Sequence, residues 1–586
     1  MAERLVVGGA SGYWGEASHA TAQLLAHPGL DVLIYDYLAE ITLSIMARAR
    51  AKDPGAGFAP DFVSAAMAPN LAEIAAKGVK VVSNAGGLNP EACAAALRAE
   101  IAKRGLKLRV AVVEGDDLTA RAADFAERRE MFSGAAFPDP AKVASINAYL
   151  GAFPIAAALS AGADIVVTGR VADSATVLAA CIWRFGWGAG DLDPLAGGSL
   201  AGHILECGPQ ATGGNFTDWR EAGDIADIGY PLAEIGADGA FTVTKPAGTA
   251  GLVTRESVAE QMLYEIGDPQ AYLLPDVVCD FSGVRIAAEG PGRVRVSGAK
   301  GGAPTGRLKV SCTWQDGFRA GYLFNFNGRE AGAKARAFAE AGLARARAKL
   351  RAMNAPDFAE TCIEVTGGRP GAGAYEEVAL KTAVRHEDSR AVGLFLKETM
   401  GAGLATPPGL HGFTGAGRPK PSPVIRLFSF LIDTAEAPPR VTLEGEPLPF
   451  APPAPPPPEP APAPHPFPEA EGEAVALLPL EALAVARSGD KGDAANVGII
   501  PRRPEYLPWI AAALTDEAIR AAIPFAKGRI ERFHLPGISA MNLLLHEALG
   551  GGGVASLLND AQGKGYAQRL LALDIPVPAA LAEGLA

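Results

Sequence analysis

The first half of the chain alternates between short β-branched runs and Ala-rich stretches in which apolar residues recur at helical spacing. The β-branched runs lie at residues 4–9, 31–37, 79–87, 108–115 and 163–170. Amphipathic stretches separate them, at 15–26, 61–77, 90–104 and 119–131. This alternation predicts βαβ units and a mostly parallel sheet in an α/β lobe over residues 1–270.

After the predicted α/β lobe, the hydrophobic runs become shorter and are separated by Gly and Pro turns, as in "GRVRVSGAKG" and "TGRLKVSCTW". They predict an antiparallel-rich second lobe of the large domain over 271–450, with a helix over 329–353. The Pro/Ala-rich segment 451–470 is typical of an extended linker, in which we expect His465 to be solvent-exposed. Residues 471–586 then form a small C-terminal domain.

The charge balance and the cysteine usage argue against several classes of protein. The 586 residues carry 53 Lys and Arg against 65 Asp and Glu, a net charge of −12, which argues against nucleic acid as a main partner. Six scattered cysteines without metal-ligand spacing favour a reduced, cytoplasmic setting. There is no run of 18 apolar residues and no signal peptide ahead of the first strand, so we expect no membrane partner.

Gly and polar residues gather where the predicted strands end. In a parallel sheet these ends share the carboxyl edge, where α/β proteins bind ligands, so the pattern predicts a pocket for a small-molecule substrate. The residues at these ends are Gly12 after the first strand, Asp36 and Glu40 after the second, Asn84, Gly86, Gly87 and Asn89 after the third, Glu114, Asp116 and Asp117 after the fourth, and Arg170 and Asp173 after the fifth.

Helix capping explains part of this polar surplus. Asn89 has the position of an N-cap, and Asp116 or Asp117 could cap the next helix. Glu114, Arg170 and one aspartate of the pair are then left without a structural task. We therefore predict that Asp116 or Asp117 is a general base. Glu114 would raise the pKa of that base, and Arg170 would pair with the carboxylates or with a substrate anion.

The first loop, "GGASGYWGE", allows a second interpretation. Its glycines resemble those of a dinucleotide-binding turn, and Asp36 lies about where a ribose-binding acid would lie. The spacing is G-G-x-x-G-x-x-G, however, and the two aromatic residues are large for a close approach of phosphate. A glycine-rich turn that lines the site is therefore preferred over an NAD site.

Two later stretches add candidates. In "GHILECGPQATGGNFTDW", His203, Glu206 and Cys207 could share a helix face. This suggests a metal site or a nucleophile, but no second ligand group has the spacing to support either, and His203 is retained as a reserve acid. Asn215, in the polar loop that follows, is like Asn84 a candidate oxyanion donor. Lys245 before a glycine-threonine loop could hold a phosphate or a carboxylate, or could be an exposed lysine on a hairpin.

Long motifs of the chain resemble those of a known family. They include "VVSNAGGLNP", "VVEGDDL", "NAYLGAFPIAAALSAGADIVVTGRVADSA", "LAGHILECGPQATGGNFTDW", "DGAFTVTKPAGTAGLVT", "AEQMLYEIGDPQAYLLPDVV", "ARSGDKGDAANVGII" and "LHEALGGGGVASLLNDAQGKGYAQRLL". On these motifs the chain resembles the AtuA family, the acyclic terpene utilisation proteins, over nearly its whole length. The first loop departs from the usual G-x-G-x-G-F-x-G-D of the family, because Glu16 stands in the acid position. Its ligand would therefore be held differently.

The resemblance implies the breakdown of citronellol- and geraniol-type compounds, or of related branched acids, through coenzyme A thioesters. It also implies a ferredoxin-like fold for the C-terminal domain and an association with biotin-dependent acyl-CoA carboxylases. In that domain the loop "RSGDKGDAANVG" contains Lys491 and could close over the pocket of the large domain or bind a phosphate. The other interpretation is a charge-balanced turn.

We therefore expect a cytoplasmic, homo-oligomeric enzyme, a lyase or hydratase that acts on a branched acyl-CoA or a related carboxylate. The catalytic candidates are Glu114, Asp116, Asp117, Arg170, Asp173 and His203. The substrate-binding candidates are Gly12, Asn84, Gly86, Gly87, Asn89, Asn215, Lys245 and Lys491. No cofactor is required and no residue is assigned to a metal, although a divalent metal is compatible with the acids. The alternatives are a non-catalytic scaffold of a biotin-dependent acyl-CoA carboxylase and an NAD-dependent oxidoreductase.

Overall fold

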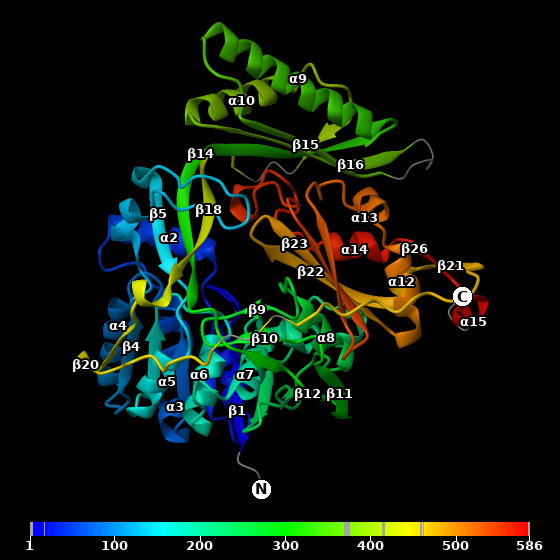
Figure 1. Ribbon diagram of the computed structural model, residues 1–586. Helices are drawn as coiled ribbons and strands as arrows, with labels where there is room; N and C mark the ends of the chain where they lie inside the picture. Colours follow the sequence, from blue (N-terminus) through cyan, green and yellow to red (C-terminus); the bar gives the residue numbers. More distant parts are fainter. Residues whose placement is uncertain are drawn as a thin grey trace. The chain divides into compact units, whose positions relative to one another are not determined.

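The five predicted strands form the centre of an open, 11-stranded sheet (Figure 1). They pair parallel in the order β1-β2-β3-β6-β4. Their bounds are β1 (Arg4–Gly9), β2 (Val32–Tyr35), β3 (Lys80–Ser83), β4 (Val110–Glu114) and β6 (Ile165–Thr168). Because all five run in one direction, the loops that follow them meet at one edge of the sheet.

Antiparallel strands extend this sheet on both sides. Next to β1 lie β7 (Leu232–Gly236), β8 (Phe241–Thr244), β12 (Arg293–Ser297) and β11 (Arg285–Gly290), and next to β4 lie β19 (Arg440–Leu443) and β20 (Glu446–Leu448). Four of them, β11, β12, β19 and β20, come from the segment expected to form a separate second lobe. They join the first sheet because a parallel core leaves open edges, which neighbouring hairpins can cover.

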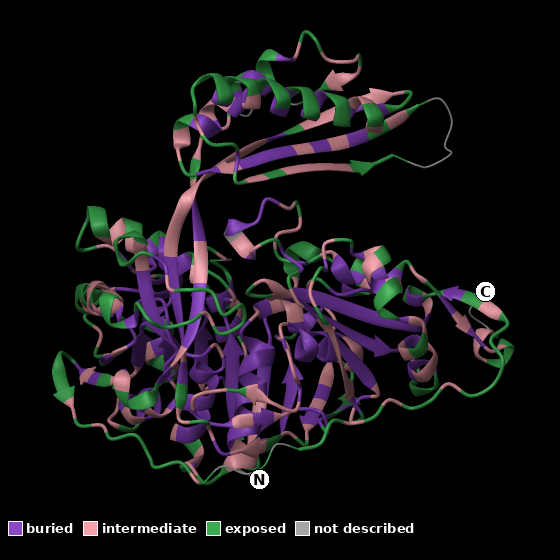
Figure 2. Cartoon of the chain, turned by 45° about the horizontal axis from the view of Figure 1, so that its top comes forward, coloured by how far each residue is buried: buried purple, intermediate pink, exposed green. Residues whose placement is uncertain are grey.

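Helices cover both faces of the parallel core. Side chains of α1, α3 and α4 pack on one face with Val81, Val110 and Val112, and α5, α6 and α7 contact one another and the sheet. The helices of this part are α1 (Ala20–Leu25), α2 (Glu40–Lys52), α3 (Leu71–Lys77), α4 (Pro90–Lys103), α5 (Phe153–Ser160), α6 (Ala175–Phe185), α7 (Leu192–Leu205) and α8 (Arg255–Leu263). Figure 2 shows the central strands as buried.

Two amphipathic stretches form shorter helices than predicted. The stretch 61–77 divides into a π-helical turn (Phe62–Met67) and α3. Pro69 lies between them and has no N–H for a continuous helix. The stretch 119–131 forms only a 3-10 turn (Thr119–Phe125), in which Phe125 is the single buried residue. One buried side chain gives a longer helix little to pack against the core.

The structure is a computed structural model that describes residues 4–16, 18–368, 375–412, 417–457, 460 and 462–583. Its contacts separate two units: unit 1 comprises Met1–Thr313, Leu427–Ala548 and Gly563–Ala586, and unit 2 comprises Trp314–Arg426 and Leu549–Gln562. The boundary expected near residue 270 therefore lies inside unit 1. Short strands of unit 1 outside the main sheet are β5 (Val143–Ala148), β9 (Tyr272–Leu273), β10 (Val278–Asp280) and β13 (Lys300–Gly302).

Unit 2 is an antiparallel sheet with two helices on one face (Figure 1). The helix expected over 329–353 is α9 (Ala331–Ala352), which packs beside α10 (Ser389–Gly401). Both helices bury aromatic residues against the sheet, with Phe338 from α9 and Phe395 from α10. The strands are β14 (Arg307–Gly328), β15 (Glu360–Gly367), β16 (Glu376–His386), β17 (Leu410–His411) and β18 (Ser422–Asp433), of which β14 and β18 begin or end in unit 1.

The C-terminal domain belongs to unit 1, except for Leu549–Gln562, and forms the antiparallel sheet β22-β23-β25-β24. Its elements are β21 (Ala476–Pro479), α11 (Leu480–Leu483), β22 (Ala484–Lys491), β23 (Ala494–Pro501), α12 (Leu507–Ala513), α13 (Asp516–Ala522), β24 (Ile530–Leu535), β25 (Ala540–Leu545), α14 (Tyr566–Leu571), β26 (Asp574–Val577) and α15 (Ala579–Ala582). The stretch "RSGDKGDAANVG", expected as a loop, is mostly the strand pair β22 and β23.

The proline-rich linker lies against unit 1 near its end. The Gln270 amide donates to the Ala463 carbonyl at 3.2 Å, and His465 Nε2 lies 3.1 Å from Ser282 Oγ. Phe467 stacks on His534 with ring centroids 5.2 Å apart. The expectation that His465 is only solvent-exposed was therefore wrong, because its ring has a hydrogen-bond partner and is half-buried.

Gly86 tests how tightly the carboxyl edge is packed. A Cβ at this position would lie 2.5 Å from the Thr168 carbonyl oxygen and 2.8 Å from Pro90 Cα. We expect Gly86→Ala to destabilise the fold by about 1–3 kcal/mol, because backbone atoms must move apart. The control is Gly190→Ala, where the added Cβ meets nothing within 4 Å. Thermal unfolding midpoints compare the two, and equal midpoints would contradict the close packing.

Candidate functional site

Three carboxylates meet at the carboxyl edge of the parallel sheet. One oxygen each of Asp36, Asp173 and Glu206 lies within 4.8 Å of the other two. Asp36 follows β2, Asp173 precedes α6, and Glu206 ends α7. Asp36 and Glu206 are buried, whereas the Asp173 side chain keeps 33% of its surface exposed. Asp173 therefore marks the side from which solvent reaches these residues, which we call the acid cluster.

Asn84 positions the first member of the acid cluster. Its Nδ2 donates to Asp36 Oδ1 at 2.5 Å, and its Oδ1 accepts from the Tyr37 amide at 2.7 Å. Both polar atoms of the buried Asn84 side chain are thus engaged with the loop after β2. The predicted binding residue holds Asp36 in place and connects the ends of β2 and β3.

Arg170 supplies the positive charge beside the cluster. Its Nη1 lies 2.7 Å from Asp173 Oδ1 and donates to the Leu38 carbonyl at 2.7 Å. The guanidinium lies over the Tyr149 ring, 4.1 Å from the centroid. Its Nε has no hydrogen-bond partner among the described residues, although the side chain is buried. The Arg170 guanidinium therefore pairs with Asp173 rather than with the acids of "VEGDD", and it keeps one buried donor for another group.

Of the residues behind Arg170, sequence reasoning named only Glu40, at the end of the second strand. The Tyr149 hydroxyl donates to Glu40 Oε1 at 2.5 Å, and Lys309 Nζ lies 3.3 Å from the same oxygen. Burial alone would raise the pKa of Glu40, but Lys309 and Arg170 outweigh it and hold that pKa well below its usual range. Glu40 is thus an anion that balances Lys309. Tyr149 and Lys309 lie outside every strand-end motif, so no local signal marked them.

His203 and Glu206 form a buried pair on the opposite side of the cluster. His203 Nδ1 lies 3.1 Å from Glu206 Oε1, and its Nε2 lies 3.1 Å from the Met262 carbonyl. Nε2 therefore faces a carbonyl acceptor and Nδ1 lies within ion-pair distance of a carboxylate, although Nδ1 makes no hydrogen bond among the described residues. Both neighbours favour the doubly protonated imidazolium. Burial lowers the pKa of His203, but the Glu206 carboxylate outweighs this effect and the pKa lies above its ordinary value.

Burial and mutual repulsion push protons onto the acids. Burial and the nearby Asp173 raise the pKa of Asp36 well above its ordinary value. Burial raises the pKa of Glu206 to about 7, although His203 opposes the shift. Burial and Glu206 also raise the pKa of Cys207, so its thiol stays protonated at neutral pH. Cys207 is therefore unsuited to act as a nucleophile.

The three acids of "VEGDD" are separated by the structure. Glu114 pairs with Arg440 of β19 at 3.0 Å, and Asp117 pairs with Arg50 at 2.8 Å. Asp117 also accepts from the amide of Thr119 at 3.0 Å, as a capping residue would. Both thus have structural partners away from the acid cluster, contrary to the expectation that Glu114 lacked one.

Asp116 is the buried member of that trio. Its Oδ2 accepts from the Arg170 amide and from Asn147 Nδ2, both at 2.8 Å. Gly169 leaves room for it, since a Cβ there would lie 2.2 Å from Asp116 Oδ1. Burial raises the pKa of Asp116 to about 7, with Asp117 as a minor contributor. Asp116 therefore fixes the backbone that carries Arg170.

The remaining predicted binding residues have mostly local contacts. The Asn89 side chain caps α4 and donates to the carbonyls of Pro54 and Ala56. Lys245 Nζ donates to the Thr249 carbonyl at 2.6 Å. Asn215 is exposed, with a left-handed φ of 52°. Gly87 also has positive φ, and a Cβ there would meet the Met46 sulfur at 2.2 Å.

The first glycine-rich loop is held in place by hydrogen bonds to one of its own side chains, Glu16. The Gly12 amide donates to Glu16 Oε2 at 2.6 Å, and Tyr230 donates to Glu16 Oε1 at 2.7 Å. A Cβ at Gly12 would lie 2.9 Å from Cys207 Cα, so the loop lies against the end of α7. Glu16 thus accepts the hydrogen bond of the Gly12 amide, which a dinucleotide phosphate would need. Asp36 is buried and accepts a hydrogen bond from Asn84, so its carboxylate is not free to bind a ribose. Neither feature favours an NAD site.

The C-terminal domain contributes a wall of the site. Lys491 Nζ lies over the ring of Tyr272, 5.4 Å from its centroid, and the same ring is 5.8 Å from that of His203. Lys491 therefore lies beside the His203–Glu206 pair, although it is separated from that pair by more than 280 positions in the sequence. Of the predicted binding residues, it is the one that the C-terminal domain brings near the acid cluster.

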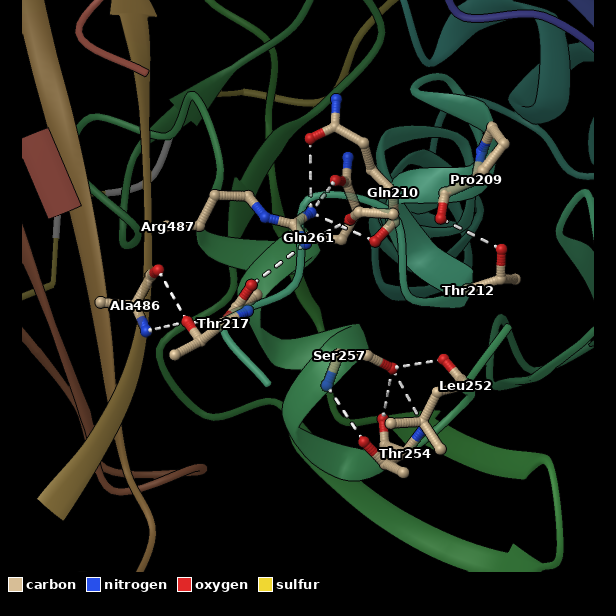
Figure 3. Close-up of polar contacts among 12 residues, drawn as sticks. Pro209, Gln210, Thr212, Thr217, Leu252, Thr254, Ser257, Gln261, Ala486 and Arg487 are labelled. Atoms are coloured by element: carbon tan, nitrogen blue, oxygen red, sulfur yellow. Dashed lines mark hydrogen bonds and ion pairs between the residues drawn. The ribbon is translucent and has the colours of Figure 1, made fainter. Parts of the chain in front are cut away.

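A buried arginine fastens this domain to the large domain (Figure 3). Arg487 donates to Gln261 Oε1 at 2.9 Å, to the Gly214 carbonyl at 2.9 Å and to the Gln210 carbonyl at 3.2 Å. It also lies 3.1 Å from Glu260 Oε2, with both side chains almost fully buried.

Comparison with known families identifies the chain. A family model described as acyclic terpene utilisation family protein AtuA matches residues 5–443, and a model described as AtuA ferredoxin-like domain matches residues 478–576. The chain belongs to the AtuA family. No curated protein and no solved structure matches it. None of the described helices of this AtuA protein is long and apolar enough to cross a membrane.

The AtuA ferredoxin-like domain depends on Arg487 for its attachment. We expect Arg487→Ala to lower the thermal midpoint of the full chain strongly, because it leaves Glu260 buried without its cation, at a cost of about 3–5 kcal/mol. Arg503→Ala is the control, since Arg503 is exposed and contacts only near neighbours in the sequence among the described residues, Glu505 and the Tyr506 ring. The double variant Arg487→Met/Glu260→Gln should lose less than Arg487→Ala. A loss equal to that of the control would contradict the buried pair.

Asp116 should make stability depend on pH. In the folded protein it keeps its proton up to about pH 7, whereas it ionises near pH 4 when unfolded. The stability that it contributes is therefore complete below about pH 4 and is lost as the pH rises to about 7, by at most about 1.4 kcal/mol per pH unit. Thermal midpoints between about pH 5 and pH 7.5 should fall less steeply for Asp116→Asn than for the unmodified chain. Parallel profiles would refute this assignment.

Proposed function

We propose that this AtuA protein is an enzyme of acyclic terpene or branched-acid breakdown, and that it acts as a lyase or hydratase on a branched acyl-CoA or a related carboxylate. The family description supports the first part. The acid cluster carries the second part, because it places three carboxylates within 4.8 Å of one another at the edge of a parallel sheet.

The charged residues of the site would have two tasks in the proposed reaction, proton transfer and anion binding. Removal of a proton next to a carbonyl, or loss of a hydroxyl as water, needs a carboxylate that can take up or give back a proton. Asp173 is the exposed member of the cluster and therefore the one that substrate meets first. Arg170 lies beside it with an unpartnered Nε, and a guanidinium can hold a substrate carboxylate or a developing enolate oxygen.

The His203–Glu206 pair completes the arrangement. The imidazole keeps Glu206 in place from one side, and Lys491 lies on the same wall through Tyr272. An anionic substrate such as a carboxylate or a thioester of coenzyme A would meet two cations, Arg170 beside Asp173 and Lys491 beside His203. The negative charge of the whole chain makes such a local pair of cations necessary for anion binding.

The scaffold alternative has less support than it had from sequence. It was motivated by a proline spacer that could carry a free docking domain. The end of the linker is bonded to unit 1 at Ala463 and His465, and Arg487 is buried against the large domain. The C-terminal domain is therefore packed where it can take part in the site.

Turnover decides between the two functions. Purified protein is incubated with a panel of branched unsaturated and 3-hydroxyglutaryl-type CoA thioesters, with and without Mg²⁺, and the products are measured by mass spectrometry. We expect the gain or loss of one water or a cleaved fragment. Asp173→Asn should reduce the rate by about 10²-fold or more, the usual cost of losing an acid–base group.

Asp139→Asn is the matched control, because Asp139 is an exposed cap of a 3-10 turn. It should retain the rate of the unmodified chain. Turnover that survives in Asp173→Asn would remove the acid cluster from the reaction, and no turnover with any thioester would favour the scaffold.

A further inference from the structure

Two carboxylate oxygens of the acid cluster are buried without a hydrogen-bond donor among the described residues: Asp173 Oδ1, which is in ion-pair contact with Arg170, and Glu206 Oε2. Glu206 Oε1 faces His203 at 3.1 Å, but Glu206 Oε2 has no hydrogen-bond partner within the described part of the chain. Only 7% of this side chain is exposed. A carboxylate oxygen shielded from water and from donors is costly, so the position favours a cation or a proton.

The charges around this oxygen do not balance. Three carboxylates share the cluster, and Arg170 is the guanidinium that contacts them, at Asp173. Lys309 is directed to Glu40, His203 contacts Glu206 among the three carboxylates, and Lys491 lies over the Tyr272 ring rather than on a carboxylate. Even with His203 protonated, the ionised cluster carries one surplus negative charge, and with His203 neutral it carries two. A divalent cation supplies the missing charge.

We propose that Asp36, Asp173 and Glu206 bind a divalent cation of the Mg²⁺ and Mn²⁺ class. The donor set consists of carboxylate oxygens, which these hard cations prefer. His203 is not among the three residues whose ligand atoms lie within 4.8 Å of one another, so imidazole is not part of a donor set that would select Zn²⁺. Opposite ligands of an octahedral Mg²⁺ ion lie about 4.2 Å apart. At most one pair of the three oxygens can be opposite, and adjacent ligands lie about 2.9 Å apart. The oxygens, which lie within 4.8 Å of one another, therefore have to move closer by side-chain rotation to share one ion.

Neighbouring contacts prepare the three ligands without using up their oxygens. Asn84 bonds to Oδ1 of Asp36, Arg170 contacts Oδ1 of Asp173, and His203 contacts Oε1 of Glu206. Each carboxylate therefore has one oxygen beside a neighbouring side chain, and Glu206 has a second, buried oxygen without a hydrogen-bond partner among the described residues. Such outer contacts are typical of metal sites, because they orient ligands before the metal arrives.

The cation would sit in the site of the proposed reaction, and its part in turnover rests on that proposed function. There it would polarise the carbonyl or hydroxyl oxygen of the substrate next to Arg170. Binding of the cation is independent of substrate, however, and is measured without it. The metal inference and the proposed function can therefore fail separately.

The test is a titration of the chelator-treated full chain with Mn²⁺, followed by the loss of the electron paramagnetic resonance signal of free Mn²⁺. We expect one bound ion per chain, displaced by Mg²⁺. Glu206→Gln and Asp173→Asn should each weaken binding by about tenfold or more. The controls are Glu73→Gln and Asp139→Asn, exposed acids on α3 and on a 3-10 turn, which should bind as the unmodified chain does.

Circular dichroism establishes that each variant is folded, and Asp36→Asn serves as a third variant, since its amide oxygen can still accept from Asn84. The Mn²⁺ titration of the unmodified chain needs no variant, and it can overturn the inference by itself. Absence of bound Mn²⁺, or equal binding by the site variants and the controls, would overturn the inference. Turnover that persists in full in excess chelator would overturn the part of the cation in the reaction while leaving the proposed function.

Discussion

The buried guanidinium of Arg170 is the interaction on which the carboxyl edge depends. One of its nitrogens contacts the Asp173 carboxylate and the Leu38 carbonyl, so a single side chain joins the loop after β6 to the loop after β2. Its flat face lies on the Tyr149 ring. A buried cation is tolerated only where anions and acceptors surround it, and here those anions are the residues of the site.

This constraint explains the tight packing around Arg170. Asp116 accepts hydrogen bonds from the Arg170 amide and from the Asn147 side chain of β5. Gly169 is small enough to let that carboxylate approach. Gly86 allows the loop after β3 to touch the end of β6 in the same manner. The edge is therefore a set of mutually bonded loops, in which a change at one strand end is transmitted to the next.

The location of the candidate site could be predicted from the sequence, but the residues that form it could not. Polar residues at the ends of β-branched runs mark the carboxyl edge, because parallel pairing is a local consequence of βαβ units. Which of those residues share the acid cluster depends on distant partners. Glu114 looked unpaired until Arg440, 326 positions away, was placed beside it. Asp36 and Glu206 were noticed for other reasons, as a ribose acid and as a helix neighbour of His203, and only the fold brings them together.

The C-terminal domain shows the same limit on a larger scale. In the sequence, Arg487 is one charged residue of a polar stretch. In the structure it is a buried strand residue that donates hydrogen bonds to Gln210, Gly214 and Gln261 of the large domain. Carbonyls of the loop that contains Gln210 and Gly214 accept hydrogen bonds from the second domain, which adds to the loop's own internal hydrogen bonds. Four positions further along the strand, Lys491 reaches Tyr272 beside His203. A domain that both donates hydrogen bonds to the polar loop and supplies a cation to the wall of the site completes the site, and this is a physical reason for one chain to contain both parts.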